Sequence, residues 1–432
     1  MAFDSGQISF VRLQVEGNLL GKAPLAADQS LLDKLAERKF TESSIGAPDE
    51  TEYGWTAGDH LYDTQFNYEK NSFGDMMLMS MRVDTNKPPA DVKRAYKIMN
   101  EQALAANNPS GFASKNQRRE AAELATRQLH EDLAAGKYRR SKIVPVLWDL
   151  RRAWVYCGAT SNAAIENLTK LFKLTFDATL TPITSGSFAG NWLHAKGRGR
   201  DYEDMRPSAF TPPPPQARRD MDEMDAVNTD IKIPHIPWAT TGVDLKDFLG
   251  NEFLIWLWHI QETDEGVIEV ETSGGKAGYA FVLTKALDMQ CAWDATGRMG
   301  LRSDGPTRLP ESAEALAEGK WPRKVGMILT DLQDSDAQFE LSFQGDQLQI
   351  SGVKIPSIED AETPRDIVER RLLVVRSLSD MVDTLYSQFL DQRTSTGWSS
   401  KRESIRDWIK QRRRPAAPVT VKASEAAVQA ES

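Results

Sequence analysis

Residues 137–157 read KYRRSKIVPVLWDLRRAWVYC, a cationic segment followed by two apolar runs of strand length. The first run covers residues 143–149, residues 150–152 form a turn, and residues 153–157 return as a second strand. Residues 161–172 follow with helical spacing, which would pack their apolar face against the hairpin. A strand hairpin followed by a helix predicts an α+β fold with mixed antiparallel sheets.

The same periodicities predict elements on both sides of this segment. Strands are expected at residues 10–15, 52–55, 76–83, 266–271, 280–283, 324–330, 339–343 and 347–352. Helices are expected at residues 29–40, 90–106, 115–135, 245–260, 312–318, 364–393 and 400–414. Gly136 should end the third of these helices, since glycine adopts the backbone conformation found just beyond a helix terminus.

Composition divides the chain into four regions. The first is an α+β region at residues 1–195, which contains a basic arm at residues 82–152. Residues 196–243 include four consecutive prolines and are expected to form a linker or inserted loop. A second α+β region is predicted at residues 244–414. The Ala/Pro/Val-rich tail, residues 415–432, is expected to be disordered.

The bulk properties are those of a soluble globular protein. The 432 residues are 40% hydrophobic and 27% charged, and no apolar run approaches the roughly 18–20 residues that span a bilayer. The N-terminal residues lack the pattern of a secretory signal, so the cytoplasm is the expected compartment. Cys157 and Cys291 are predicted to be buried free thiols, as in a reducing environment.

The basic arm stands out from an acidic chain. Residues 82–152 hold fifteen Lys and Arg against eight Asp and Glu, a net +7, whereas the whole chain carries −9. A positively charged segment on a protein of negative net charge attracts a polyanion to that segment, while the rest of the protein repels it. Its candidate DNA-binding residues are Lys115, Arg118, Arg119, Arg127, Lys137, Tyr138, Arg139, Arg140 and Lys142. A solvated helix face is the structural alternative for the helical part.

No pattern of residues indicates an enzyme, a metal site or a cofactor. The five histidines are scattered, and no cysteine pair has metal-ligand spacing. Gly274-Gly275-Lys276 lacks both the first glycine and the Ser/Thr of a phosphate-binding loop. Acidic clusters at 201–204 and 220–225 lie in the proline-rich segment. Glu269 and Glu271 with Lys276 fit the solvent face of a strand better than a two-metal nuclease strand.

Five short motifs resemble the recombination-associated RdgC family. They are EYGW at 52–55, VLWD at 146–149, LTPI at 180–183, GNEFLIWLW at 250–258, and Phe389-Leu390 with Arg393 and Trp398. The resemblance covers about residues 8–190 and 244–410. It implies a ring-shaped homodimer that encircles duplex DNA, binds it without sequence preference and limits recombinase access, as a nucleoid-associated protein.

By position, the resemblance carries Lys137, Tyr138, Arg139 and Arg140 onto the family's DNA-contacting segment. The family's aromatic residue there is phenylalanine, so Tyr138 keeps the ring and adds a hydroxyl group. The proline-rich segment and the C-terminal tail depart from the family pattern and put ring closure in question. Residues 253–258 carry more aromatic area than one helix face normally buries, which fits either a dimer contact or burial within their own domain.

Three functions remain open from the sequence. The leading expectation is a non-enzymatic protein that binds double-stranded DNA, with single-stranded DNA as a further candidate partner, and modulates recombination. A metal-dependent nuclease using Glu271 is the second. The third is a scaffold whose basic arm meets an acidic protein.

Overall fold

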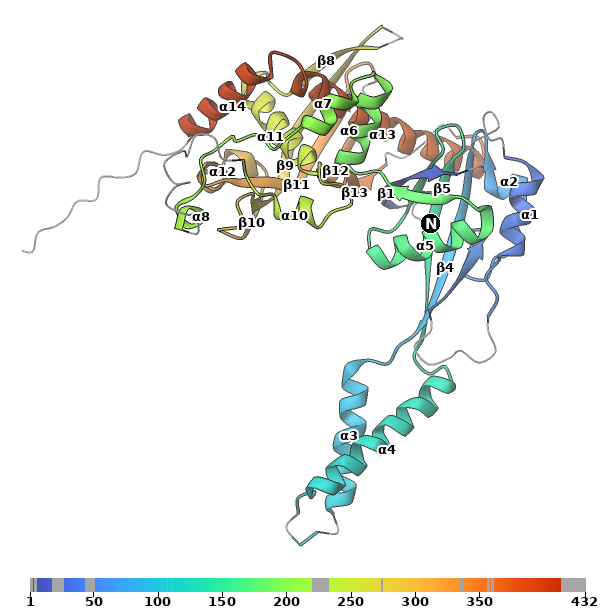
Figure 1. Cartoon of the computed structure of the whole chain (residues 1–432). Coiled ribbons are helices and arrows are strands. Elements are labelled where there is room, and N and C mark those ends of the chain that lie inside the picture. Colours follow the sequence, from blue (N-terminus) through green and yellow to red (C-terminus); the bar gives the residue numbers. More distant parts are fainter. Residues whose placement is uncertain are drawn as a thin grey trace, which may run out of the picture. The chain divides into compact units, whose positions relative to one another are not determined.

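The computed structural model describes residues 3, 6–17, 27–42, 51–106, 108–109, 111–219, 233–272, 275–334, 337–355, 358 and 361–412. The chain divides into two compact units, which are described separately below. Unit 1 comprises Met1–Phe188, Asp336–Phe343 and Gln347–Asp383, and unit 2 comprises Ala189–Ser335, Gln344–Asp346 and Thr384–Ser432. Antiparallel strands combine with helices in both units, so the α+β prediction is confirmed (Figure 1).

Unit 1 is built on an antiparallel sheet with the order β12-β13-β1-β6-β5-β4-β2, in which β3 pairs with β4 and β7 pairs with β1. Its strands are β1 (Gln7–Glu16), β2 (Thr51–Thr56), β3 (Ser72–Phe73), β4 (Met76–Asn86), β5 (Arg139–Asp149), β6 (Trp154–Cys157), β7 (Thr179–Pro182), β12 (Gln338–Gln344) and β13 (Gln349–Lys354). The longest ladder joins β4 to β5 without interruption, from Met76 opposite Asp149 to Asn86 opposite Arg139.

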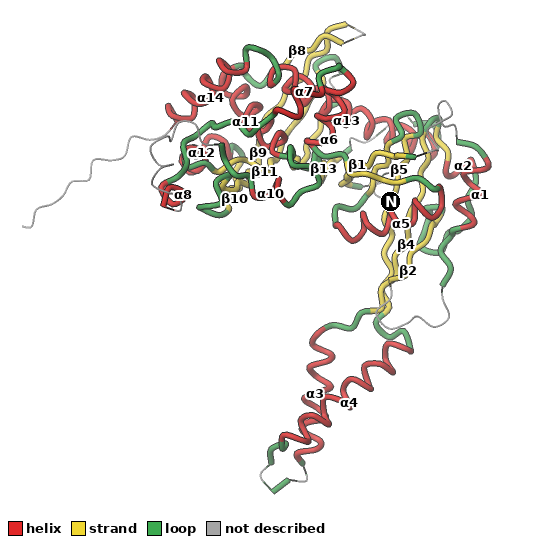
Figure 2. The backbone as a smooth tube through the Cα atoms, viewed as in Figure 1, coloured by secondary structure: helices red, strands yellow, loops and turns green. Residues whose placement is uncertain are grey.

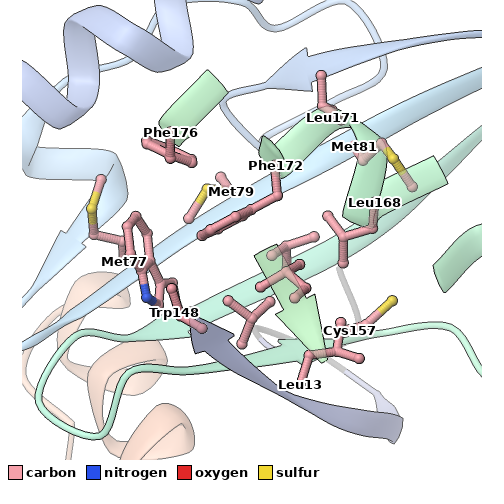
Figure 3. Packing of buried hydrophobic residues seen from close by; sticks show 14 of the residues in the cluster. Leu13, Met77, Met79, Met81, Trp148, Cys157, Leu168, Leu171, Phe172 and Phe176 are labelled. Carbon is pink, nitrogen blue, oxygen red and sulfur yellow. The ribbon is translucent and has the colours of Figure 1, made fainter. Parts of the chain in front are cut away.

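One face of this sheet is covered by α1 (Gln29–Glu37) and α5 (Asn162–Phe176). Trp148 of β5 is fully buried, with its ring centroid 5.1 Å from Phe172 and 5.0 Å from Phe176 (Figure 3). Side chains of this size each contribute roughly 1.5–3 kcal/mol when removed from water. The apolar alternation seen in the sequence therefore corresponds to the core that fixes the sheet.

The opposite face of the sheet is held by charged contacts to α13 (Pro364–Arg393). Arg12 of β1 donates to both carboxylate oxygens of Asp383, at 2.7 and 2.6 Å, and Arg376 donates to Asp149 at 2.7 Å. These contacts join Arg12 and Asp149 to residues more than 200 positions later in the chain. Since β13 also pairs with β1, the sheet draws on the C-terminal part of the chain. The expected division into residues 1–195 and 244–414 therefore differs from the observed one.

Two helices form a hairpin between β4 and β5 (Figures 1 and 2). They are α3 (Ala90–Ala105) and α4 (Lys115–Ala134). Ser114 and Gln117 form a reciprocal capping box at the start of α4, which satisfies two backbone donors that a helix terminus leaves free. Gly136 follows the end of α4 with φ +71°, so the predicted glycine stop is confirmed. The short helix α2 (Tyr68–Asn71) precedes β3 in the same unit.

Unit 2 contains strands in the order β10-β9-β11, with β8 also paired to β9. They are β8 (Val267–Thr272), β9 (Gly275–Cys291), β10 (Arg298–Ser303) and β11 (Lys320–Asp331). The helices are α7 (Gly199–Asp204), α8 (Pro215–Arg219), α10 (Pro237–Thr240), α11 (Phe248–Thr263), the 3-10 helix η2 (Pro306–Arg308), α12 (Pro310–Ala317) and α14 (Trp398–Arg412). Helix α6 (Ser185–Ala195) contains the division between the units.

Helix α11 is buried along almost its whole length within unit 2. Every residue from Phe248 to Ile260 is buried, and Phe253 lies edge-on to Tyr386 with ring centroids 5.2 Å apart. Own-domain burial therefore accounts for residues 253–258. These aromatic side chains are not available as the dimer contact that the sequence left open.

The proline-rich segment is packed into unit 2 on both sides of residues 220–232, which lie outside the described residues. Phe210 is buried with its ring 5.5 Å from Trp321, and Glu252 of α11 accepts a hydrogen bond from the backbone of Ser208 at 2.5 Å. Trp238 donates to Asn251 at 2.7 Å. The prolines predicted a linker or an inserted loop, and the buried Phe210 and Trp238 anchor the described parts of this segment to the core of unit 2.

Two further expectations can be compared with the structure. Cys157 and Cys291 are both free and buried, as predicted. Within the described part of the chain, none of the helices has the length and apolar composition needed to cross a membrane. The tail at 415–432 lies outside the described residues.

Candidate nucleic-acid interface

The positive charge of the basic arm is concentrated at the base of the hairpin and not along its helices. Helices α3 and α4 together hold seven Lys and Arg against six Asp and Glu, so they are almost neutral. Outside these two helices, residues 82–152 contain the other eight Lys and Arg but only two carboxylates, Asp84 and Asp149. These eight lie on β4, on β5 or in the connections beside them. The helical part is therefore a mixed-charge surface, and the strands with their connections carry the excess positive charge.

Lys137 and Tyr138 are engaged in a cluster centred on Asp132. The Asp132 carboxylate accepts hydrogen bonds from the hydroxyl of Tyr96 at 2.5 Å, from the hydroxyl of Tyr138 at 2.7 Å and from Nζ of Lys137 at 3.0 Å. The Tyr96 and Tyr138 hydrogen bonds, followed by that of Lys137, lower the pKa of Asp132 to about 2. This cluster ties α3, the end of α4 and the start of β5 together.

Arg139 is also paired within the molecule. It donates to Asp84 at 3.0 Å and to Glu52 at 2.6 Å. Asp84 is 2% exposed and receives two further hydrogen bonds from Arg82, both of 2.8 Å. Burial acts to raise the pKa of Asp84, but the hydrogen bonds from Arg82, Ser141 and Arg139 outweigh it and lower the pKa.

The same network also holds the segment around Phe40 against the sheet. The Arg82 guanidinium lies 4.1 Å from the ring centroid of Phe40, a cation–π geometry. Gly54 lets the backbone of Phe40 lie against β2, because a Cβ there would lie 2.6 Å from Cα of Phe40. The EYGW motif at 52–55 thus supplies one carboxylate and one close backbone contact to the network.

Arg140 and Lys142 differ from their neighbours on β5. Both are exposed, and no carboxylate of the described residues lies within ion-pair distance of either. Side chains alternate along a strand, so Arg140 and Lys142 project from the face opposite Arg139 and Ser141. Two residues along a strand span about 6.6 Å, which is the expected separation of these two positions. Lys142 stands opposite Val83 in the ladder, at the edge of the apolar cluster under α1 and α5.

The four helical cations predicted as DNA contacts are all exposed on α4. Arg119 lies 3.4 Å from Glu123, which is a surface pair of little energy. No ion pair with a described residue is present for Lys115, Arg118 or Arg127. The structure therefore separates the nine predicted residues into three groups. Lys137, Tyr138 and Arg139 are engaged internally, Arg140 and Lys142 form a free pair, and the others are dispersed along α4.

The internal partners could not be identified from the sequence. Glu52 and Asp84 lie 87 and 55 residues from Arg139, and only strand pairing brings them together. One local signal was present: Arg82 lies in the strand predicted at 76–83 and Asp84 follows it by one residue, so a slightly longer strand would place the two on one face. That signal indicated a pairing, but it did not show that Arg139 would join it.

The carboxylates considered for nuclease chemistry are dispersed and exposed. On β8, Glu271 faces Lys276 of β9 in the ladder, and Glu269 lies 4.0 Å from Lys276. Asp201 and Asp204 lie on α7, and residues 220–225 are outside the described residues. Among the residues that the structure describes, no group of three or more His, Cys, Asp or Glu is placed to hold a metal ion.

Comparison with protein-family models gave no match, and comparison with curated protein sequences gave none either.

Proposed function

We propose that this protein binds duplex DNA without sequence preference, with Arg140 and Lys142 of β5 as the principal contacts. The observation that carries this proposal is that these two cations are exposed and have no ion-pair partner among the described residues, whereas Arg139 on the same strand is neutralised. A chain with net charge −9 repels DNA elsewhere, which favours contact at this one place.

The arrangement favours binding to phosphates over reading of bases. Arg140 and Lys142 are fixed by the β4–β5 ladder, so little backbone freedom is lost on binding. Cations that neutralise phosphates release counterions, and the resulting affinity is independent of sequence and falls steeply with salt. Lys115, Arg118 and Arg127 of α4 would add weaker, dispersed contacts of the same kind.

The resemblance to the RdgC family extends this proposal. It implies a homodimer that encircles duplex DNA and restrains recombinase loading, in the nucleoid of a cell. In this extended form, Arg140 is the residue of the carried-over segment that is exposed and has no ion pair within the described part of the chain. Tyr138 would act at the hairpin base and not as a stacking residue.

The test is fluorescence anisotropy with labelled duplexes of unrelated sequence, measured from about 50 to 200 mM salt. The Arg140→Ala/Lys142→Ala variant is compared with Lys34→Ala/Lys170→Ala, which removes the same charge from α1 and α5 of the same unit. We expect similar affinity for all duplexes and a large loss only in the first variant. Equal losses in the two variants would show a general charge effect and overturn the assignment.

Encirclement has a separate test. The protein is sized in solution and then mixed with linear and with covalently closed circular duplexes of equal length. A closed ring should load on linear duplex and poorly on circles. Equal loading on linear and circular duplexes, together with a monomer in solution, would contradict the proposed ring. It would not contradict DNA binding.

A further inference from the structure

Unit 2 contains a second cationic site, on the face of its sheet where β9, β10 and β11 run side by side. A groove with a cavity volume of about 330 Å³ opens there, lined mainly by Asp288, Gln290, Arg298, Gly300, Arg323 and Lys324. Arg302 lies beside it and donates to Asp288 at 2.7 Å. The only carboxylate among these lining residues is thus already paired.

Arg323 is held in a fixed position at this groove. Its guanidinium donates to Gln290 at 3.0 Å and to Asp346 at 2.6 Å, and lies 5.0 Å from the ring centroid of Trp238. Its Nε atom is buried and has no hydrogen-bond partner among the described residues. A buried donor without a partner is costly, so a group that accepted this hydrogen bond would be stabilised.

Two further cations face the groove without internal partners. Lys324 is half-buried and Arg298 is exposed, and neither forms an ion pair within the described part of the chain. The ladder places Lys324 and Gly300 opposite the same residue, Asp288, from its two sides. A Cβ at position 300 would lie 3.0 Å from Oδ1 of Asp288, so glycine keeps the floor of the groove open between the cations.

We infer that this groove binds a phosphate group, with Arg298 and Lys324 supplying the charge and Arg323 the fixed planar donor. Arg323 offers its Nε–H to the ligand, since Nη1 and Nη2 already donate to Gln290 and Asp346 and fix the plane of the guanidinium. The volume lies at the lower end of the range for small-ligand sites. The phosphate can belong to a small phosphorylated molecule or to a nucleic-acid backbone. The site does not depend on the DNA contact proposed for β5.

The experiment uses the full chain and two probes, inorganic pyrophosphate by titration calorimetry and a labelled duplex by anisotropy. The variant Arg298→Ala/Lys324→Ala is compared with Lys410→Ala, an exposed cation on α14, and with Lys324→Arg, which keeps the charge. Loss of two charge-assisted contacts should weaken binding at the groove by about tenfold or more. Lys410→Ala and Lys324→Arg should bind like the wild type.

The two probes distinguish the sources of phosphate. Pyrophosphate binding that is lost only in the double variant identifies a small phosphorylated ligand. If pyrophosphate does not bind, but the double variant weakens duplex binding and Lys410→Ala does not, the backbone is the source. If the double variant changes neither measurement, the inference is wrong. The Arg140→Ala/Lys142→Ala variant should keep its pyrophosphate affinity, so failure of the β5 proposal would be recognised separately.

Discussion

The two faces of strand β5 carry the same kinds of residue and have different surroundings. On one face, Arg139 is neutralised by Asp84 and Glu52 and lies beside Arg82. On the other, Arg140 and Lys142 meet no carboxylate of the described residues. The comparison teaches that the number of Lys and Arg in a basic run does not predict how many of them are available to bind a ligand. In a strand, half of such a run can serve the fold while the other half remains available to a ligand.

The largest effect is expected on the paired face. Asp84→Ala removes the buried carboxylate shared by Arg82 and Arg139, and breaking a buried ion pair from one side costs about 3–5 kcal/mol. The free energy of unfolding from urea titration should fall by that amount. Glu42→Ala, which removes a half-exposed partner of Arg82, should cost less than about 1 kcal/mol. Equal costs would show that the network is not a buried one.

The next largest effect is expected on the free face. Arg140→Ala/Lys142→Ala should lower duplex affinity roughly a hundredfold at low salt and reduce the salt slope by about 2, since two phosphate contacts are lost. The free energy of unfolding should hardly change, because neither side chain forms an ion pair with a residue that the structure describes. A variant that unfolds more easily and binds DNA normally would reverse the roles assigned to the two faces.

A smaller effect is expected at the hairpin base. Tyr138→Phe removes the hydroxyl that donates to Asp132 but keeps the aromatic ring. Hydrogen exchange of the backbone amides at 133–138 should become faster, while duplex affinity stays at the wild-type value. A strong loss of DNA binding would instead show that the Tyr138 hydroxyl contacts the ligand.

The smallest effect is a dependence on acid. The folded-state pKa of Asp132 is about 2, below the ordinary 3.8, so its stabilisation is complete above pH 3.8 and is lost as the pH falls toward 2. The ring signals of Tyr96 and Tyr138 in NMR spectra should shift over that window. Asp132→Asn should abolish this titration, and a persisting shift would assign it to another group.

Much of the fold could be predicted because its elements are encoded locally. The bounds of α13 and the glycine stop after α4 follow from apolar spacing and one residue type. Strand β10 was missed, since only Met299 and Leu301 alternate with its Arg and Gly residues, which is too short a pattern to identify a strand. The start of β5 at Arg139 was missed as well, because the long ladder with β4, and not the propensity of four consecutive polar residues, holds residues 139–142 in a strand.

The candidate site was predictable in composition but not in arrangement. Charge counting found the correct segment, since net charge depends on residue types alone. The division into paired and free cations depends on Glu52 and Asp84, which reach Arg139 only through the sheet. The groove at Arg298, Arg323 and Lys324 had no signal in the sequence, because two of its three strands meet across a β-bulge between Pro322 and Lys324.

The uninterrupted β4–β5 ladder has a mechanical consequence for the hairpin of α3 and α4. Eleven consecutive residue pairs, from Met76–Asp149 to Asn86–Arg139, join β4 and β5 along their whole length. This continuous hydrogen-bonded pairing resists bending more than the single-chain connections do. A force applied at the far end of the helices is therefore concentrated in the two short connections, residues 87–89 and 135–138. Asp132 accepts hydrogen bonds from Tyr96 and Tyr138 at these connections, so the angle between the hairpin and the sheet depends on a few hydrogen bonds.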